Sequence, residues 1–156
     1  MKIFVDADSC PKSARDLVLR RSLKLGIQPV FAANHLIPGC EDAQMEICCA
    51  KENSADDKIV ELSKKGDIVI TRDVPLAKRL VEKEVAVLDD RGRIFTVNNI
   101  NEALSLRNFS VGLANDGLGM ERIANYGKKE LKNFADSLDR MLTAALRLQG
   151  TGSASA

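Results

Sequence analysis

The sequence predicts an α/β protein with three layers, in which a mainly parallel sheet carries helices on both faces. Short apolar runs alternate with longer amphipathic segments, and this alternation implies right-handed crossovers between parallel strands. The chain has 156 residues, of which 45% are hydrophobic, so it can bury the core of one ordinary domain. We assign residues 1–150 to this single domain. Residues 151–156 are small and polar and are expected to form a disordered tail.

Each predicted strand is a short apolar run, and these runs cover residues 2–6, 29–32, 45–50, 68–71, 85–88 and 94–97. Each predicted helix has apolar residues at helical spacing, and these segments cover residues 11–26, 55–65, 74–83, 101–106 and 131–145. Pro11 and Pro75 suit a first helical turn, whereas Gly26 and Gly66 suit a helix end. The glycine-rich segment 112–119 is predicted to be a mobile loop.

The bulk composition bears on the class of protein. The net charge of +1 is weak evidence about partners, because it lacks the strongly basic balance that would have favoured nucleic acid but excludes no partner. No apolar run reaches the roughly 18 residues that span a membrane, and no secretory signal is visible, so we expect a cytoplasmic protein without a membrane partner. Cys10, Cys40, Cys48 and Cys49 form no CxxC pair and the chain has one histidine, which argues against structural zinc.

Acidic residues stand at three places where the predicted sheet would build a site. Two of these places follow strands and one opens a helix; they are Asp6-Ala7-Asp8, Asp73 and Asp56-Asp57. The carboxyl ends of parallel strands meet at one edge of the sheet, so these side chains should converge. A divalent cation would compensate their mutual repulsion, and oxygen ligands suit Mg²⁺ or Mn²⁺.

We therefore take Asp6, Asp56 and Asp73 as candidate metal ligands, and these three together with Asp8 as candidate catalytic residues. Crowded carboxylates should include at least one whose pKa is raised. Capping is the alternative role for Asp56 and Asp73, because both stand where helices begin. Asp8 could equally bind metal or cap the first helix, and both roles remain open.

Neighbouring polar residues are candidates for binding a substrate phosphate. The hydroxyls of Ser9 and Thr71 could contact phosphate or metal-bound water. The guanidinium groups of Arg15, Arg72 and Arg91 could form a phosphate-contacting rim around the acidic centre. The alternative is that these basic residues belong to solvated helix faces.

The segment Val5-Asp6-Ala7-Asp8-Ser9-Cys10-Pro11 closely resembles the VDADxCP opening of the YaiI/YqxD family, also called UPF0178 or DUF188. Further segments match this family in order, and they are residues 55–60, residues 66–77 and Arg91-Gly92. Asn34 matches the Asn that follows the second strand in the family, and we take it as a substrate-binding candidate. The resemblance spans residues 1–148.

The family is similar to the PIN-like group of metal-dependent nuclease folds, so the resemblance implies a PIN-like domain. Such domains place an Asp after the first strand, an acidic residue at the start of a middle helix, and an Asp in a Thr-x-Asp segment. These positions correspond to Asp6, Asp56 and Asp73, with Asp57 as an alternative to Asp56. One departure is Asp89-Asp90, where the family often has Asn-Pro; it adds negative charge near the rim.

The leading hypothesis is a Mg²⁺- or Mn²⁺-dependent nuclease that hydrolyses RNA or single-stranded nucleic acid, with RNA favoured by the fold group that the family resembles. Homodimer formation is left open. A phosphatase of the haloacid dehalogenase type is less favoured, because its late acidic residue would be Asp67, at the start of a strand. The third hypothesis is a non-catalytic regulator that binds nucleic acid or metal. Only five Phe and one Tyr are available for base stacking, which weakens it.

Overall fold

The computed structural model describes residues 1–7, 10–33, 44–47, 54–115 and 126–154. Within these ranges the strands are β1 (Lys2–Asp6), β2 (Gln28–Ala33), β3 (Gln44–Ile47), β4 (Ile68–Ile70), β5 (Ala86–Leu88) and β6 (Ile94–Phe95). The helices are α1 (Lys12–Leu25), α2 (Ser54–Leu62), α3 (Val74–Glu82), α4 (Ile100–Asn115) and α5 (Lys128–Ala154). The predicted strands and helices are therefore present and follow one another in the predicted order.

The strands form one sheet in the order β3-β2-β1-β4-β5-β6. All neighbouring pairs are parallel except β5 and β6, which are antiparallel. β1 lies at the centre, where Val5 is in register with Phe31 of β2 on one side and Ile70 of β4 on the other. The parallel strands thus end along a common edge, which we call the carboxyl edge; the opposite edge is the amino edge.

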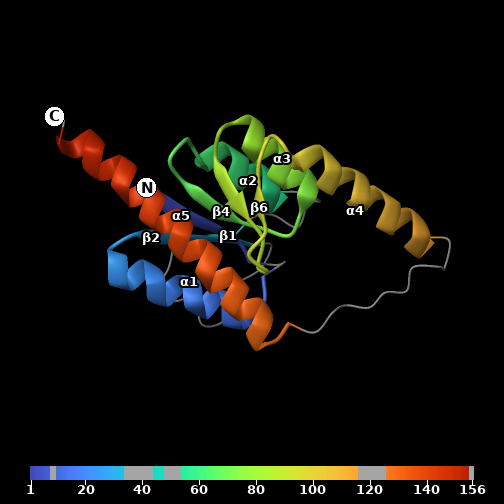
Figure 1. The fold of residues 1–156 in the computed structure, drawn as a ribbon, viewed down its shortest axis with the longest axis horizontal. Helices are drawn as coiled ribbons and strands as arrows, with labels where there is room; N and C mark the ends of the chain where they lie inside the picture. The colour runs from blue at the N-terminus through green and yellow to red at the C-terminus, as the bar shows by residue number, and fades with distance from the viewer. Residues whose placement is uncertain (8–9, 34–43, 48–53, 116–125, 155–156) are drawn as a thin grey trace.

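Helices cover both faces of the sheet, so the fold is a three-layer α/β sandwich (Figure 1). Alternate residues of β1 point to opposite faces, as strand geometry requires. Ile3 and Val5 pack with α1 and α5, whereas Phe4 packs in a second core with α2, α3 and α4. The predicted layered architecture is confirmed.

Two helices extend beyond their predicted limits. α4 reaches Asn115, so the part of the predicted loop at 112–115 is helical. A single glycine such as Gly112 costs a helix only about 1 kcal/mol, which is too little to end it. α5 continues to Ala154 and so includes residues 151–154 of the predicted tail. α2 ends earlier than expected, at Leu62, and the turn at Gly66 has a φ of +100°.

No helix in the described parts of the chain is long and apolar enough to cross a membrane.

Candidate functional site

The central carboxylates lie where the chain changes direction across the sheet. From β1 the chain enters α1 on one face, and from the adjacent β4 it enters α3 on the other face. In open α/β sheets such a switch point leaves a crevice at the carboxyl ends of the two strands. Asp6 is the last residue of β1, and Asp73 follows β4 by three residues. The topology therefore brings these two predicted site residues to the same switch point at the carboxyl edge.

A chain of hydrogen bonds connects Asp6 to the start of α3. The Thr71 hydroxyl donates to Asp6 Oδ2 at 2.9 Å, and the backbone N–H of Asp73 donates to Thr71 Oγ1 at 3.0 Å. Asp73 Oδ1 in turn accepts from the N–H of Leu76 at 3.1 Å, which makes Asp73 the N-cap of α3. Asp6 and Thr71 are both buried. Thr71 thus connects the Asp6 carboxylate to the backbone of Asp73, and its predicted contact with phosphate or metal-bound water stays a prediction.

Asp56 joins this group from the first turn of α2. Its pKa is raised to about 7, first by burial, then by the charges of Asp73 and Asp6, and by its hydrogen bond with Asp73; Arg79 opposes the rise. The prediction that one crowded carboxyl has a raised pKa is confirmed, although burial rather than repulsion is the larger cause. At neutral pH the Asp56 carboxyl group is therefore partly protonated, and a cation bound beside it would favour the loss of that proton.

The neighbouring carboxylate, Asp57, points to a different partner. Its Oδ1 accepts from Nη1 of Arg79 on α3 at 3.0 Å, in an exposed ion pair. Asp56, by contrast, interacts with Asp73 and Asp6. The structure thus separates two adjacent residues that sequence alone left as alternatives.

The carboxylates offer only oxygen donors, which fit Mg²⁺ or Mn²⁺ chemically. As they stand, no three His, Cys, Asp or Glu side chains of the described residues are arranged to hold a metal ion. Mg²⁺ in particular is commonly held by one or two carboxylates, with waters and substrate phosphates completing its shell. Asp56 and Asp73, whose carboxyl groups are close enough to share a hydrogen bond, are the pair that fits this mode once Asp56 has lost its proton.

The three predicted phosphate-binding arginines differ in what they contact. Arg15 donates from Nη1 to the carbonyl of Cys10 at 2.6 Å, and so stabilises the start of α1. Arg72 forms an ion pair with Asp90, with Nη2 2.6 Å from Oδ2. Arg91 is exposed, and it contributes, after backbone N–H groups, to lowering the pKa of Glu130 near the start of α5. Arg91 therefore lies nearer to the start of α5 than Arg15 and Arg72 do.

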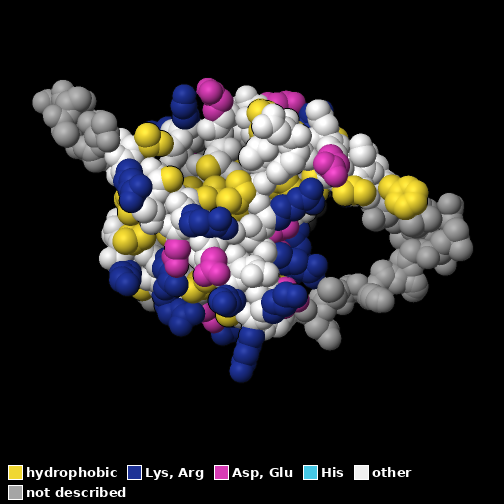
Figure 2. Space-filling view, in the orientation of Figure 1, with side chains coloured by type: hydrophobic (Ala, Val, Ile, Leu, Met, Phe, Trp, Pro, Cys, Tyr) yellow, Lys and Arg dark blue, Asp and Glu magenta, His cyan; other side chains and the backbone are white. Residues whose placement is uncertain are grey.

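The buried thiol of Cys10 lies near both acidic and basic side chains of the carboxyl edge. Burial raises its pKa to about 12, and Asp90 and Asp6 add to the rise while Arg15 and Arg72 oppose it. Such a thiol is not a nucleophile at neutral pH. Its surroundings show that acidic and basic groups share the carboxyl edge. Figure 2 shows Lys and Arg side chains at the right of the body, and others at its left and along its lower part.

Asp89 and Asp90 do not simply add negative charge to the rim. Asp89 Oδ1 accepts the backbone N–H groups of Arg91 and Arg93, both at 2.9 Å, and so closes its own turn. Asp90 is 1% exposed and is paired with Arg72. Sequence reasoning missed this pairing. The available signal was the adjacency of the two strands, since both residues lie two positions beyond the ends of β4 and β5.

Asp8, Ser9 and Asn34 lie outside the described residues, so the ligand-or-cap alternative for Asp8 stays open. Cys40, Cys48 and Cys49 lie outside them as well.

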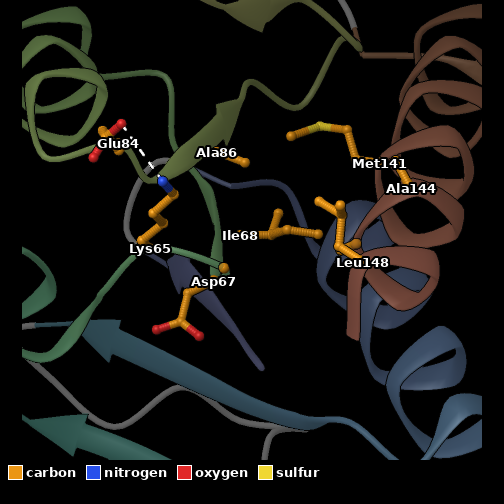
Figure 3. Close-up of a pocket in the computed structure, with 10 residues that line it drawn as sticks. Lys65, Asp67, Ile68, Glu84, Ala86, Met141, Ala144 and Leu148 are labelled. Carbon is orange, nitrogen blue, oxygen red and sulfur yellow. Dashed lines mark ion pairs between the residues drawn. The ribbon is translucent and has the colours of Figure 1, made fainter. Parts of the chain in front are cut away.

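The amino edge has a different character. A pocket of about 500 Å³ lies between the starts of β4 and β5 and the later turns of α5. Figure 3 shows Ile68 directed toward Met141 and Leu148 on α5, with the Lys65–Glu84 ion pair at the side. The buried Asp67 accepts the N–H groups of Lys2 and Lys64 at 2.9 and 3.0 Å. Asp67 thus stabilises the backbone at the edge opposite Asp6. This position disfavours the hypothesis of a haloacid dehalogenase-type phosphatase, in which Asp67 would have to join Asp6 in the site.

The sequence comparisons agree with the motif resemblance. Residues 4–144 match the model of the family described as "Uncharacterized BCR, YaiI/YqxD family" (DUF188). Relatives named UPF0178 protein occur in Treponema denticola, at 46% identity over 94% of this chain and 95% of the relative, and in Treponema pallidum, at 40% identity over 95% and 85%. A third, from Ectopseudomonas mendocina, is 40% identical over 94% of this chain and 100% of its own.

The layered fold and its acidic switch point define an α/β protein with a carboxylate site at the sheet edge. The chain belongs to the YaiI/YqxD (UPF0178) family. No solved structure matches it.

Proposed function

We propose that the protein is a divalent-metal-dependent nuclease that hydrolyses phosphodiester bonds in RNA or single-stranded nucleic acid. The observation that carries the proposal is the meeting of Asp6, Asp56 and Asp73 at the switch point, where the pKa of Asp56 is raised to about 7. The likeness of the family to PIN-like nucleases supports the same reaction, as an analogy. RNA is the expected substrate by the same likeness.

In this mechanism Asp56 and Asp73 would hold Mg²⁺ or Mn²⁺. Such an ion, when bound, activates water and neutralises charge on the phosphate. Asp6 supplies the third carboxylate, and the hydrogen bond from the Thr71 hydroxyl holds it beside this pair. Because the pKa of Asp56 is raised to about 7 without a bound cation, this carboxyl group must release its proton to hold the metal, so metal binding should strengthen as pH rises through 7. Arg72 is the basic side chain best placed to contact a phosphate oxygen, since it stands between Thr71 and Asp73 in the chain.

The test is incubation of purified protein with single-stranded RNA in Mn²⁺, in Mg²⁺ and in EDTA. We expect cleavage only with metal. Asp56→Asn should abolish it, whereas Asp57→Asn should retain it, because Asp57 faces Arg79 instead of the site. The two variants are a matched pair, because both residues lie in the first turn of α2 and each substitution removes one negative charge.

Equal activity in both variants, or cleavage that survives EDTA, would refute the proposed mechanism. Metal binding without cleavage would instead favour the non-catalytic regulator.

A further inference from the structure

The ion pair between Arg72 and Asp90 has an unusual balance of burial. Asp90 Oδ2 accepts from Arg72 Nε at 2.7 Å and lies 2.6 Å from Nη2. The Asp90 side chain is 1% exposed, whereas the Arg72 side chain is 41% exposed. The carboxylate is therefore an interior anchor, and the guanidinium extends from it to the surface of the carboxyl edge.

Asp90 strongly restricts where the guanidinium can go. Asp90 Oδ1 is buried and has no hydrogen-bond partner among the described residues, so Arg72 provides the hydrogen bonds that this carboxylate receives there. If Arg72 swung away, a buried charge would be left unpaired, and that is strongly unfavourable. The Nε and Nη2 edge faces Asp90, which directs the Nη1 side of the guanidinium away from it.

The turn that carries Asp90 is held by α5 and by the residue two positions before it. The Tyr126 hydroxyl donates to the backbone carbonyl of Asp90 at 2.5 Å. Ser137 of α5 donates to the carbonyl of Gly92 at 2.7 Å, in the same turn. The turn between β5 and β6 is thus fixed from its own side by Asp89, by the Ser137 hydroxyl of α5 and by the hydroxyl of Tyr126, which lies just before α5. A group placed by such a rigid frame loses little entropy when it binds a ligand.

The guanidinium also lies beside the proposed site. Arg72 directly follows Thr71, whose hydroxyl bonds Asp6, and directly precedes Asp73. Arg72 and Asp6 both act on the Cys10 thiol, which places them around one buried point. A planar guanidinium presents N–H groups that suit a phosphate oxygen better than an ammonium does.

We propose that Asp90 is a positioning residue, which holds the Arg72 guanidinium at the carboxyl edge so that it binds a phosphodiester oxygen of the substrate. The proposal rests on the proposed function in one respect, that this edge receives a nucleic-acid backbone. It assigns a role to a residue of the turn after β5, in addition to the carboxylates of the switch point.

The test measures equilibrium binding of a short fluorescein-labelled oligouridylate in EDTA, where cleavage cannot occur. Asp90→Asn, which keeps the size of the side chain, should weaken binding about tenfold. Arg72→Lys should weaken it by a similar factor, because Lys keeps the charge but lacks the planar guanidinium with its paired N–H groups. The double variant should also lose only about tenfold, because both changes remove one positioned contact. Melting curves confirm that each variant is folded at the assay temperature.

The matched control is a second Arg–Asp pair outside the site. Arg21 of α1 donates from Nε to Asp139 of α5 at 2.8 Å, and Asp139→Asn should leave oligouridylate affinity unchanged. Wild-type affinity in folded Asp90→Asn, multiplicative losses in the double variant, or no binding by the wild-type protein would each overturn the proposal. If Asp90→Asn does not fold, wild-type affinity in Arg72→Lys overturns it alone.

The two proposals fail separately. Metal-dependent cleavage with unchanged affinity in Asp90→Asn removes the positioning role and keeps the nuclease. A tenfold, non-additive loss of binding in a protein that never cleaves RNA removes the nuclease and keeps the positioned arginine.

Discussion

The two edges of the sheet handle charge in opposite ways. At the carboxyl edge, Asp6 and Asp90 are buried, and Asp56 is partly buried beside Asp73. At the amino edge, the Lys65–Glu84 ion pair is mostly exposed, with side chains 76% and 71% exposed and a separation of 3.7 Å. The buried Asp67 there is satisfied by backbone N–H groups.

This contrast indicates where the molecule accepts an energetic cost. Burying carboxylates close together is unfavourable unless they are paired or serve a site. The amino edge has no such group of neighbouring carboxylates among the described residues and instead has an apolar pocket. At the carboxyl edge, the switch point brings several carboxylates together despite their repulsion. The contrast therefore supports the carboxyl edge as the functional one, and four experiments can break or sharpen it.

The largest effect is expected on activity. The double variant Asp6→Asn, Asp73→Asn should lower metal-dependent RNA cleavage at least about a thousandfold, because it removes two of the charges that attract the metal. Folding should survive, since Asn caps a helix about as well as Asp and can still bond Leu76. The control is Glu84→Gln at the amino edge, which should cleave RNA at the wild-type rate. Full activity and full Mn²⁺ binding in the double variant would remove the carboxyl edge as the reaction site.

Removing the basic side chain of an ion pair should lower the free energy of unfolding more at the carboxyl edge than at the amino edge. Arg72→Met leaves the Asp90 carboxylate buried without its partner and should lower the free energy of unfolding by about 2–4 kcal/mol. Lys65→Met should change it by less than about 0.5 kcal/mol, because Lys65 and Glu84 are exposed. Urea denaturation at neutral pH measures both. Similar values for the two variants would mean that the Arg72–Asp90 pair is no more buried in solution than the surface pair.

Glycine turns at the two edges provide a third comparison. Both Gly66 and Gly92 have positive φ, at +100° and +89°. A Cβ on Gly92 would lie 2.4 Å from the Asn133 carbonyl oxygen of α5, whereas a Cβ on Gly66 would meet nothing within 4 Å. Gly66→Ala should cost about 1 kcal/mol through backbone strain alone, and Gly92→Ala about 2–4 kcal/mol through strain and the clash. Thermal unfolding of the two variants tests this, and equal losses would show that α5 does not press on the β5–β6 turn.

The sequence was sufficient for features that depend on neighbouring residues. Asp6 and Asp73 could be placed at one edge because Asp6 ends one apolar run and Asp73 comes soon after another, and parallel strands end together. The strands themselves were recognisable because turn residues such as Gly26 and Gly66 bound the apolar runs. Whether these carboxylates bind metal remains a prediction.

Features that depend on distant contacts could not be predicted. Nothing local distinguishes Asp56 from Asp57; the choice depends on how α2 packs against β1 and α3. The pairing of Arg72 with Asp90 depends on β4 and β5 being neighbours, and the support from Tyr126 depends on where α5 begins. The extent of α4 was underestimated because glycine was weighted as a helix end, although Gly112 lies within the helix.

The smallest expected effect is on the pH dependence of stability. The pKa of Asp56 is about 7 in the folded protein and 3.8 for an unperturbed Asp carboxyl group, so between these values the folded state binds more protons than the unfolded chain. Stability should therefore fall as pH rises from 4 to 7 and then level off. Asp56 is only half-buried, so the loss is discounted to the order of 1 kcal/mol.

The measurement is the difference in unfolding free energy between the wild-type protein and Asp56→Asn, because the titrations of all other groups cancel to first order in that difference. The variant should be more stable than the wild type at pH 8, by about 1 kcal/mol, and the difference should shrink toward zero near pH 4. Mg²⁺ should reduce the difference at pH 8, since a bound cation would relieve the repulsion between Asp56, Asp73 and Asp6. A difference that does not change with pH would mean that Asp56 titrates normally, and the carboxyl edge would then hold its carboxylates no more closely than a solvated surface does.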